Sequence, residues 1–241
     1  DFLNLSVIVF YVRRKRGVDL MKEERKEPIQ IPHIQTINDH ISYLTPTEHP
    51  LSANVVIIEG DAFFWVYDVG NHPAVSEILQ EKSEQTGKKI RVILSHFHPD
   101  HIGNLSEISC EAVYQGKNTF RYTKTGTVIE EDTWFQDGDV RLHLFPIPSS
   151  HAKGSLALEV DETWCFLGDA AYATQKNGQT VYNAERLLAE IRVLKNVRAP
   201  YFLLSHSEPF QQNKEDVLEW MEAIYEKRKR DESYIKTPQR V

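Results

Sequence analysis

Three histidines and an aspartate lie within six positions of the chain, in the segment His96-Phe97-His98-Pro99-Asp100-His101. The apolar run Val92-Ile93-Leu94 precedes them and predicts a buried strand. A single histidine at a strand end is usually an ordinary hydrogen-bonded residue, but so many imidazole and carboxylate groups together have no packing role. Imidazole nitrogen and carboxylate oxygen are common ligands of divalent metals. The segment therefore predicts a metal site.

The spacing within this segment predicts more than one ion. His96 and His98 are two positions apart, so they face the same side if the strand geometry continues. Pro99 interrupts strand and helix continuation and turns the chain before Asp100 and His101. The two pairs should therefore face different points in space, which suits two metal ions better than one.

Three other predicted strands also end at residues that can bind metal. They are the apolar runs that lead to His151, Asp169 and His206. Rigid strands that deliver the chain into loops at one sheet edge fix functional groups while leaving them accessible. We therefore expect these three residues to converge on the first cluster. The remaining histidines are interpreted as ordinary polar residues: His33, His40, His49, His72 and His143.

Strands and helices alternate along the chain in an order that can position these residues. Gly60-Asp61 predicts a hairpin between two apolar strands, and Pro73 and Gly87 mark the ends of the helix that follows. Further strand pairs are predicted around Asp137-Gly138 and within residues 154–172. A helix capped by Asn183, a buried strand over 201–206 and an amphipathic helix after it complete the pattern, and residues from Lys229 onward are expected to fray. Sheets covered by helices are the expected architecture.

The length of 241 residues suits one domain, which we assign to residues 21–241. Residues 1–20 contain an apolar run at 5–12 followed by four basic residues. That run is far shorter than the roughly 20 apolar residues that span a bilayer. We interpret residues 1–20 as a non-native or disordered extension, with the remnant of a truncated anchor as the alternative.

Composition narrows the class of partner. A net charge of −7 argues against a general nucleic-acid binder, which needs a basic face to contact phosphates. The two cysteines, Cys110 and Cys165, are too few for a disulfide framework and are consistent with a reducing compartment. We expect a cytoplasmic protein with a small-molecule substrate and no membrane or nucleic-acid partner, and the oligomeric state stays open.

The motif at 96–101, followed in order by His151, Asp169 and His206, resembles the metallo-β-lactamase superfamily over about residues 35–225. The resemblance implies an α/β fold in four αββα layers, two mixed β-sheets flanked by helices. It also implies a set of seven ligands for two divalent ions: His96, His98 and His151 for the first, Asp100, His101 and His206 for the second, and Asp169 between them. Asp68 in the segment YDVG is similar to the family's strand-end aspartate, which implies that it orients a ligand or loop; the alternative is a solvent-facing turn aspartate.

The ligand set is similar to that of the glyoxalase II-like and lactonase-like branch. The commonest β-lactamase subclass has cysteine at the position of Asp169 and no histidine at that of His101, so antibiotic hydrolysis is not expected. Flavin-linked diiron reductases usually carry glutamate where His98 stands. Quorum-quenching lactonases place a tyrosine three positions after the bridging aspartate, as Tyr172 is here. Tyr172 is therefore a candidate for hydrogen bonding to a substrate oxygen, or else a wall residue.

The resemblance implies a hydrolase in which a hydroxide bridging two metal ions cleaves an ester, thioester or lactone. Zn²⁺ is the first choice of metal, and iron or manganese fits the same ligands. Asp100 is expected to receive or relay the proton. A phosphodiesterase and a non-hydrolytic diiron sensor are the alternatives, whereas a structural site would have four ligands, often with cysteine. Substrate specificity is expected from the loops after Gly70, at 114–128 and at 172–182.

Overall fold

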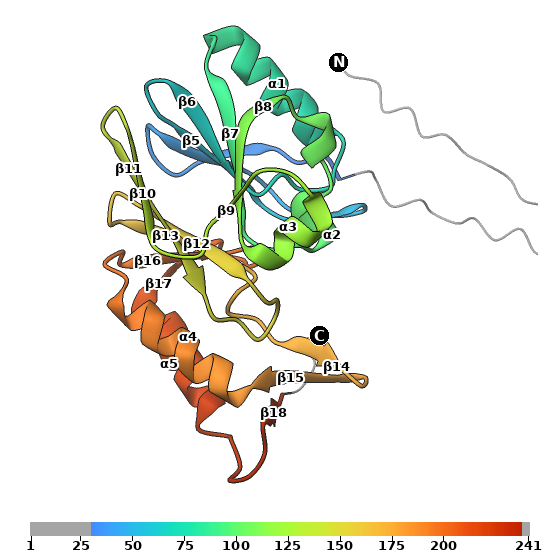
Figure 1. Cartoon of the computed structure of the whole chain (residues 1–241), viewed down its shortest axis with the longest axis vertical. Coiled ribbons are helices and arrows are strands. Elements are labelled where there is room, and N and C mark those ends of the chain that lie inside the picture. The colour runs from blue at the N-terminus through green and yellow to red at the C-terminus, as the bar shows by residue number, and fades with distance from the viewer. Residues whose placement is uncertain (1–29, 238–241) are drawn as a thin grey trace, which may run out of the picture.

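The computed structural model describes residues 30–237, which form four layers (Figure 1). Two large mixed sheets pack against each other through their inner faces, and helices cover the outer faces. This αββα arrangement is the predicted metallo-β-lactamase fold.

The first sheet carries the hairpin and the strand that precedes the histidine motif. Its seven strands lie in the order β1 (Ile34–Thr36), β2 (Ile41–Leu44), β5 (Val55–Glu59), β6 (Phe63–Tyr67), β7 (Lys89–Leu94), β8 (Cys110–Gln115) and β9 (Thr127–Val128). β5 and β6 pair antiparallel around Gly60 and Asp61, as predicted. Helix α1 (Ala74–Thr86) connects β6 to the parallel strand β7 and ends at Gly87, whose φ of 72° is the left-handed conformation that glycine adopts readily.

The second sheet carries the other predicted site residues at its strand ends. Its six strands lie in the order β10 (Thr133–Asp137), β11 (Val140–Ile147), β12 (Ser155–Val160), β13 (Trp164–Gly168), β16 (Tyr201–Leu204) and β17 (Gln211–Asn213). All neighbours are antiparallel except β13 and β16, which are parallel and joined through helix α4 (Ala184–Asn196). Helix α5 (Lys214–Tyr225) packs beside α4 on the outer face.

The apolar core has three parts, one between each pair of layers. Inward side chains of both sheets meet in the central part, which includes Trp65 and Phe166. Val75 and Leu79 of α1 pack on the outer face of the first sheet, and both amphipathic C-terminal helices pack on the second. The two sheets are also joined by a buried hydrogen bond of 3.0 Å from Trp65 Nε1 to Asp137 Oδ2.

Several short elements were not predicted from the sequence. They are β3 (Thr47–Glu48), β4 (Leu51–Ser52), α2 (Pro99–Ile102), the 3-10 turn η1 (Leu105–Glu107), α3 (Lys117–Thr123), β9, β14 (Thr174–Lys176), β15 (Gln179–Asn183), β17 and β18 (Tyr234–Lys236). The expectation that the chain frays from Lys229 onward was wrong for β18, which pairs with β15 and buries Ile235. One apolar residue between polar neighbours is too weak a pattern to predict such a strand.

The proposed extension at residues 1–20 lies outside the described residues, as do the first positions of the proposed domain 21–241. Within residues 30–237, no helix is both long enough and apolar enough to cross a membrane.

Candidate metal centre

All seven predicted ligands follow strands that end at the same edge of the two sheets. His96 and His98 follow β7, and Asp100 and His101 lie in α2 directly after them. His151 lies in the loop after β11, Asp169 directly follows β13, and His206 comes two residues after β16. Pro99 lies in the first turn of α2. The chain therefore leaves the strand at this point and enters a short helix directly.

The structure brings these residues together as two groups that share one carboxylate. Each residue of a group offers one nitrogen or oxygen within 4.8 Å of the others. The first group is His96, His98, His151 and Asp169, and the second is Asp100, His101, Asp169 and His206. Asp169 is therefore placed to bridge two ions, in the arrangement that the resemblance implied.

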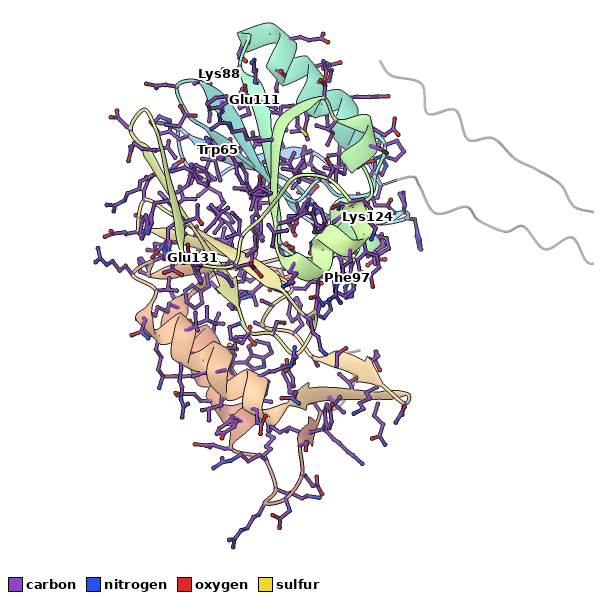
Figure 2. The ribbon with its side chains drawn as sticks, in the orientation of Figure 1. Trp65, Lys88, Phe97, Glu111, Lys124 and Glu131 are labelled. Carbon is purple, nitrogen blue, oxygen red and sulfur yellow. The ribbon has the colours of Figure 1, made fainter. Side chains whose placement is uncertain are left out.

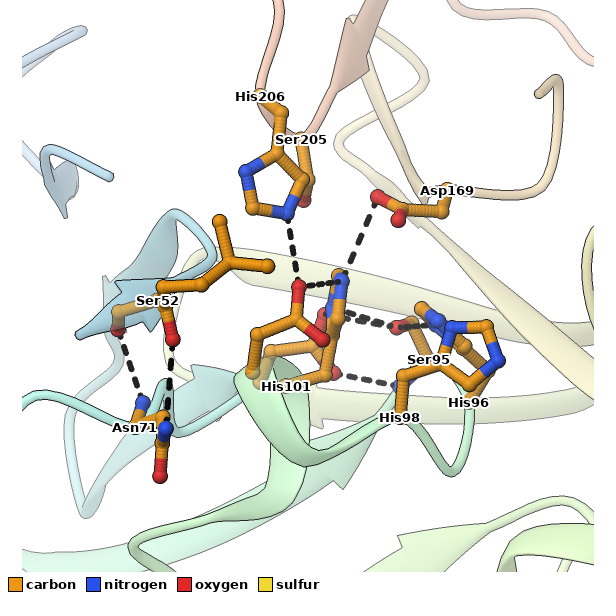
Figure 3. A network of polar contacts seen from close by, with 12 residues as sticks. Ser52, Asn71, Ser95, His96, His98, His101, Asp169, Ser205 and His206 are labelled. Atoms are coloured by element: carbon orange, nitrogen blue, oxygen red, sulfur yellow. Dashed lines mark hydrogen bonds and ion pairs between the residues drawn. The ribbon is translucent and has the colours of Figure 1, made fainter. Parts of the chain in front are cut away.

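The second group is built around His101. Its Nε2 lies 3.4 Å from Asp100 Oδ2 and 3.4 Å from Asp169 Oδ1. His206 Nε2 lies 3.0 Å from Asp100 Oδ2. In Figure 3 the His206 ring and the Asp169 carboxylate approach His101, with Ser95, His96 and His98 beside it.

The first group is built from facing imidazole rings. His98 Nδ1 lies 2.9 Å from His151 Nε2, which is also 3.3 Å from Asp169 Oδ2. The His96 and His98 rings are 4.5 Å apart between centroids and close to perpendicular. His96 is buried, whereas His98 and His151 are half-buried, so this group is open to solvent on one side.

Three buried polar atoms of the centre have no hydrogen-bond partner: His96 Nε2, His101 Nε2 and Asp169 Oδ1. The contacts of 3.4 Å around His101 Nε2 lack the geometry of a hydrogen bond. Buried polar atoms are almost always satisfied, and an orphaned one usually marks a bound water or ion. Two imidazole nitrogens and a carboxylate oxygen suit a divalent transition metal, so the residues fit the implied ions.

Hydrogen bonds behind the rings fix which nitrogen faces the centre. His101 Nδ1 donates to Asp68 Oδ2 over 2.7 Å, and His151 Nδ1 donates to the carbonyl oxygen of Ala173 over 3.0 Å. Ser95 Oγ donates to Asp68 and lies 2.9 Å from His96 Nδ1. These bonds leave the Nε2 atoms of His96, His101 and His151 directed into the centre, as metal-binding histidines require.

Asp68 is fully buried, which rules out a solvent-facing turn aspartate. Its Oδ1 accepts the backbone N–H of Ser95, and its Oδ2 accepts from the Ser95 hydroxyl and from His101. It holds a left-handed φ of 58°, a conformation that aspartate tolerates better than most residues. Asp68 therefore orients His101 and the start of the motif together.

His206 is positioned by a residue far away in the sequence. The buried Asn54 accepts the backbone N–H of His206 through its side-chain oxygen over 3.0 Å. His206 has a left-handed φ of 60°, which costs energy unless surrounding contacts hold it. Gly168, at φ 55°, lets β13 approach the motif, since a Cβ there would lie 2.7 Å from the Cβ of Ser95.

The electrostatics of the two groups differ. Burial lowers the pKa of His96 well below its usual value, and the nearby His101 adds to this effect. Burial also lowers the pKa of His98. A lowered pKa favours the neutral form of both rings, which is the form of histidine that binds a metal.

Around the second group, charged partners outweigh burial. Burial alone would lower the pKa of His101, but the carboxylates of Asp68 and Asp169 raise it well above its usual value. Burial alone would raise the pKa of Asp100, but the hydrogen bond from His206 and the charge of His101 lower it to about 2. The pKa of Asp169 is likewise lowered against its burial, chiefly by His101. A cation held at this group would supply the positive charge that these carboxylates favour on His101.

Tyr172 contacts the loop that carries His206, and its hydroxyl hydrogen is directed to that loop and not to the metal centre. Its hydroxyl donates to the backbone carbonyl of Ser205 over 2.8 Å. Tyr172 thereby braces the loop that carries His206, and a contact with substrate would use the oxygen of the hydroxyl as acceptor.

Ser95, Asn54 and Gly168 position the site but were not predicted from the sequence. A signal for the serine exists, because Leu-Ser-His occurs both at 94–96 and at 204–206. Asn54 has no local signal, because the residue that it holds is 152 positions away. The other histidines lie outside both groups, as expected; His143 stacks on Trp134 at 3.8 Å.

The fold and the two groups that share Asp169 define a protein of the metallo-β-lactamase fold with a candidate dinuclear metal centre. The family model of the metallo-β-lactamase superfamily matches residues 50–110. This segment includes Asp68 and the motif at 96–101, and it stops before His151, Asp169 and His206. No curated protein matches the chain in sequence.

Solved structures share the fold at low sequence identity. A metallo-β-lactamase from Pontibacter korlensis has a TM-score of 0.63 at 15% identity, over 82% of this chain and 100% of that one. A sec-alkylsulfatase from Pseudomonas sp. has a TM-score of 0.63 at 14% identity, over 81% of this chain and 42% of that one. A variant of the flavo di-iron protein from Thermotoga maritima has a TM-score of 0.61 at 12% identity, over 84% of this chain and 64% of that one. These structures show the metallo-β-lactamase fold, the family model matches one segment of the chain, and the branch is left open.

Proposed function

We propose that this protein is a metal-dependent hydrolase that cleaves an ester, thioester or lactone bond of a small molecule. Two divalent ions, Zn²⁺ as the first choice, would be held by His96, His98 and His151 on one side and by Asp100, His101 and His206 on the other, with Asp169 shared. The observation that carries the proposal is the convergence of three unpaired, buried ligand atoms from two sheets: His96 Nε2, His101 Nε2 and Asp169 Oδ1.

A pair of divalent ions at this centre would polarise a substrate oxygen and lower the pKa of water toward neutrality. The chain's own contribution is orientation: Asp68 fixes the tautomer of His101, Ala173 that of His151, and Ser95 that of His96. The orientation of ligands by such hydrogen bonds supports both metal affinity and rate.

Asp100 and Tyr172 are the proposed catalytic groups. A pKa of about 2 keeps the Asp100 carboxylate ionised, which supports a ligand role more strongly than proton relay. Tyr172 supports the centre through its bond to the carbonyl of Ser205, and its contact with substrate stays a prediction.

The half-buried first group supports a small-molecule substrate, because one side of the centre is accessible to solvent. The glyoxalase II-like or lactonase-like branch and a cytoplasmic location are part of the same proposal and rest on the ligand set and the scarcity of cysteine. A phosphodiester substrate and a diiron sensor without hydrolysis are the competing outcomes.

The test is metal analysis of the purified protein, followed by turnover assays with lactones, thioesters, carboxylic esters and bis-aryl phosphates. We expect about two divalent ions per chain and turnover of at least one carbonyl substrate that stops after chelation and returns with added metal. Asp169→Ala should lose both metal and turnover because both groups share this carboxylate. His40→Ala, at an exposed histidine outside both groups, is the matched control and should retain both.

Three results would decide against the proposal. Turnover confined to bis-aryl phosphates would assign a phosphodiesterase. Bound iron with an optical response to oxygen or nitric oxide and no turnover would assign a sensor. Unchanged metal content in Asp169→Ala would place the ions elsewhere.

A further inference from the structure

We infer that Phe97 and Tyr122 form an aromatic subsite beside the metal centre, which binds a flat aromatic group of the substrate. This inference rests on the proposed function for the position of the reacting bond. It adds a substrate class that the metal ligands do not specify, namely compounds with an aryl ring close to the cleavable carbonyl.

The two rings continue the array of rings that begins at the candidate ligands. The Phe97 ring lies 5.1 Å from the His98 ring between centroids, at 84° to it. The Tyr122 ring lies 4.7 Å from the Phe97 ring and is tilted by only 7°. A path of aromatic contacts therefore leads from a ligand of the first group to the surface of α3.

Close backbone packing holds helix α3 against the loop that carries His151. A Cβ on Gly116, which precedes the helix, would lie 1.9 Å from the carbonyl oxygen of Gly154. A Cβ on Gly154 would in turn lie 3.2 Å from the Cβ of Asn118, one helical turn before Tyr122. Gly154 is three residues after His151, so the Asn118–Tyr122 face of α3 lies along the loop that carries this ligand. Figure 2 labels Phe97 beside the α3 ribbon.

The exposure of Tyr122 separates a subsite from ordinary core packing. Tyr122 is 62% exposed, while Phe97, on which it stacks, is half-buried. Two of the exposed large hydrophobic residues of the described chain stack on another ring. Trp134 stacks on His143 in the second sheet, whereas Tyr122 stacks on Phe97, which lies between two candidate ligands in the sequence. Single exposed apolar residues are normal, but an exposed stack continuous with a catalytic centre supplies a ready binding face.

Stacked rings favour an aromatic occupant over an aliphatic one of equal size. Offset-stacked and edge-to-face aromatic pairs gain about 0.5–1.5 kcal/mol beyond the area they bury, which is roughly 2- to 12-fold in affinity. Cyclohexyl buries at least as much apolar surface as phenyl but has no π-face. The preference for phenyl over cyclohexyl therefore isolates stacking from general hydrophobicity.

The experiment measures binding of three hydroxamates to the metal-loaded full chain by calorimetry. Acetohydroxamate, cyclohexylacetohydroxamate and phenylacetohydroxamate share one chelating group and differ only in the side group. We expect the phenyl compound to bind about 2- to 12-fold more tightly than the cyclohexyl compound. Tyr122→Leu should remove this preference, Tyr122→Phe should keep it, and none of the variants should change the affinity for acetohydroxamate.

Trp134→Ala is the matched control, because it removes another exposed aromatic side chain, which lies on β10 and stacks on a histidine outside both ligand groups. It should leave all three affinities unchanged. Equal affinities for phenyl and cyclohexyl, a preference that survives in Tyr122→Leu, or the failure of all three compounds to bind would each overturn the inference.

Turnover of the matching acetyl, cyclohexylacetyl and phenylacetyl thioesters separates this inference from the proposed function. If the hydroxamates show the expected pattern and no carbonyl substrate is hydrolysed, the subsite stands and the proposed reaction fails. If all three thioesters are hydrolysed at similar kcat/KM and Tyr122→Leu changes none of them, the proposed reaction stands and the subsite fails.

Discussion

Asp68 and Glu190 are both completely buried carboxyl groups, one beside the metal centre and one in the helix layer over the second sheet. Asp68 accepts hydrogen bonds from the backbone and hydroxyl of Ser95 and from His101. Neither side-chain oxygen of Glu190 has a hydrogen-bond partner. Glu190 lies on the buried face of α4 among Leu187, Ile191 and Leu194.

Asp68 and Glu190 carry the same functional group, so the difference between them comes from the residues around each carboxyl group. A buried carboxylate is tolerated when donors and positive charge surround it, and otherwise it takes up a proton. The burial of Glu190 raises its pKa well above its usual value, with no opposing cause. Asp68 therefore supports the site, whereas the raised pKa of Glu190 favours its neutral form. Of these two buried acids, only the one beside the candidate ligands has hydrogen-bond donors around it.

The largest effect on function outside the ligands is expected from Asp68→Asn. A neutral amide accepts the Nδ1–H of His101 more weakly than a carboxylate does and can present its NH2 instead, so the orientation of His101 is less firmly set. We expect metal affinity at the second group and turnover to fall by about 10- to 100-fold. Metal titration and kcat/KM of the purified variant measure this.

Asp39→Asn provides the control for this change, since Asp39 is exposed and lies in a turn before β2. It should match the parent protein in both measurements. A full metal content and normal turnover in Asp68→Asn would mean that the geometry of His101 is set by its other neighbours.

Much of the fold could be predicted because local patterns agree with tertiary structure. The hairpin at Gly60 and Asp61, the cap at Asn183 and the buried runs before His96 and His206 all carry local signals that the structure retains. The elements that were missed, such as α3 and β18, have few apolar residues and depend on contacts with distant segments. Tertiary packing decides such short elements.

The convergence of the candidate ligands could be predicted, but the residues that support them could not. Ligand types and strand ends are visible in sequence, and the structure brings all seven together. The roles of Asn54 and Gly168 arise from contacts across 152 and 73 positions respectively, to His206 and to Ser95, and no local pattern reports such contacts.

Glu190→Met tests whether the buried acid without hydrogen-bond partners lowers the stability of the fold. Replacing an unpaired buried acid by an apolar side chain of similar length should stabilise the protein by about 1–3 kcal/mol. This corresponds to a rise in Tm of about 2–4 °C per kcal/mol for a chain of this size. Thermal unfolding of the metal-free protein is the measurement, because bound ions would add their own stabilisation.

The gain should also depend on pH, because the pKa of Glu190 is raised by folding. Above the usual pKa of 4.5 the unfolded chain releases this proton while the folded chain keeps it, so stability falls as the pH rises toward the folded pKa. Glu190→Gln does not titrate and escapes this loss. Its Tm relative to the parent protein should therefore be higher at pH 8 than at pH 5. A difference that is equal at both pH values, or a destabilised variant at both, would mean that Glu190 is charged and paired in solution.

Asn183→Ala, at the N-cap of the helix that carries Glu190, tests whether the pH dependence belongs to Glu190 itself. It has the smallest expected effect on stability. The Asn183 side chain accepts the backbone N–H of Arg186 over 3.0 Å, and loss of such a cap costs about 1 kcal/mol. The amide does not titrate, so this loss should be the same at pH 5 and pH 8 in thermal unfolding. A pH-independent change at Asn183 together with a pH-dependent change at Glu190 would assign the titration to the buried acid and not to α4 as a whole. If the two variants showed the same pH dependence, the titrating group would lie elsewhere in the layer that α4 covers.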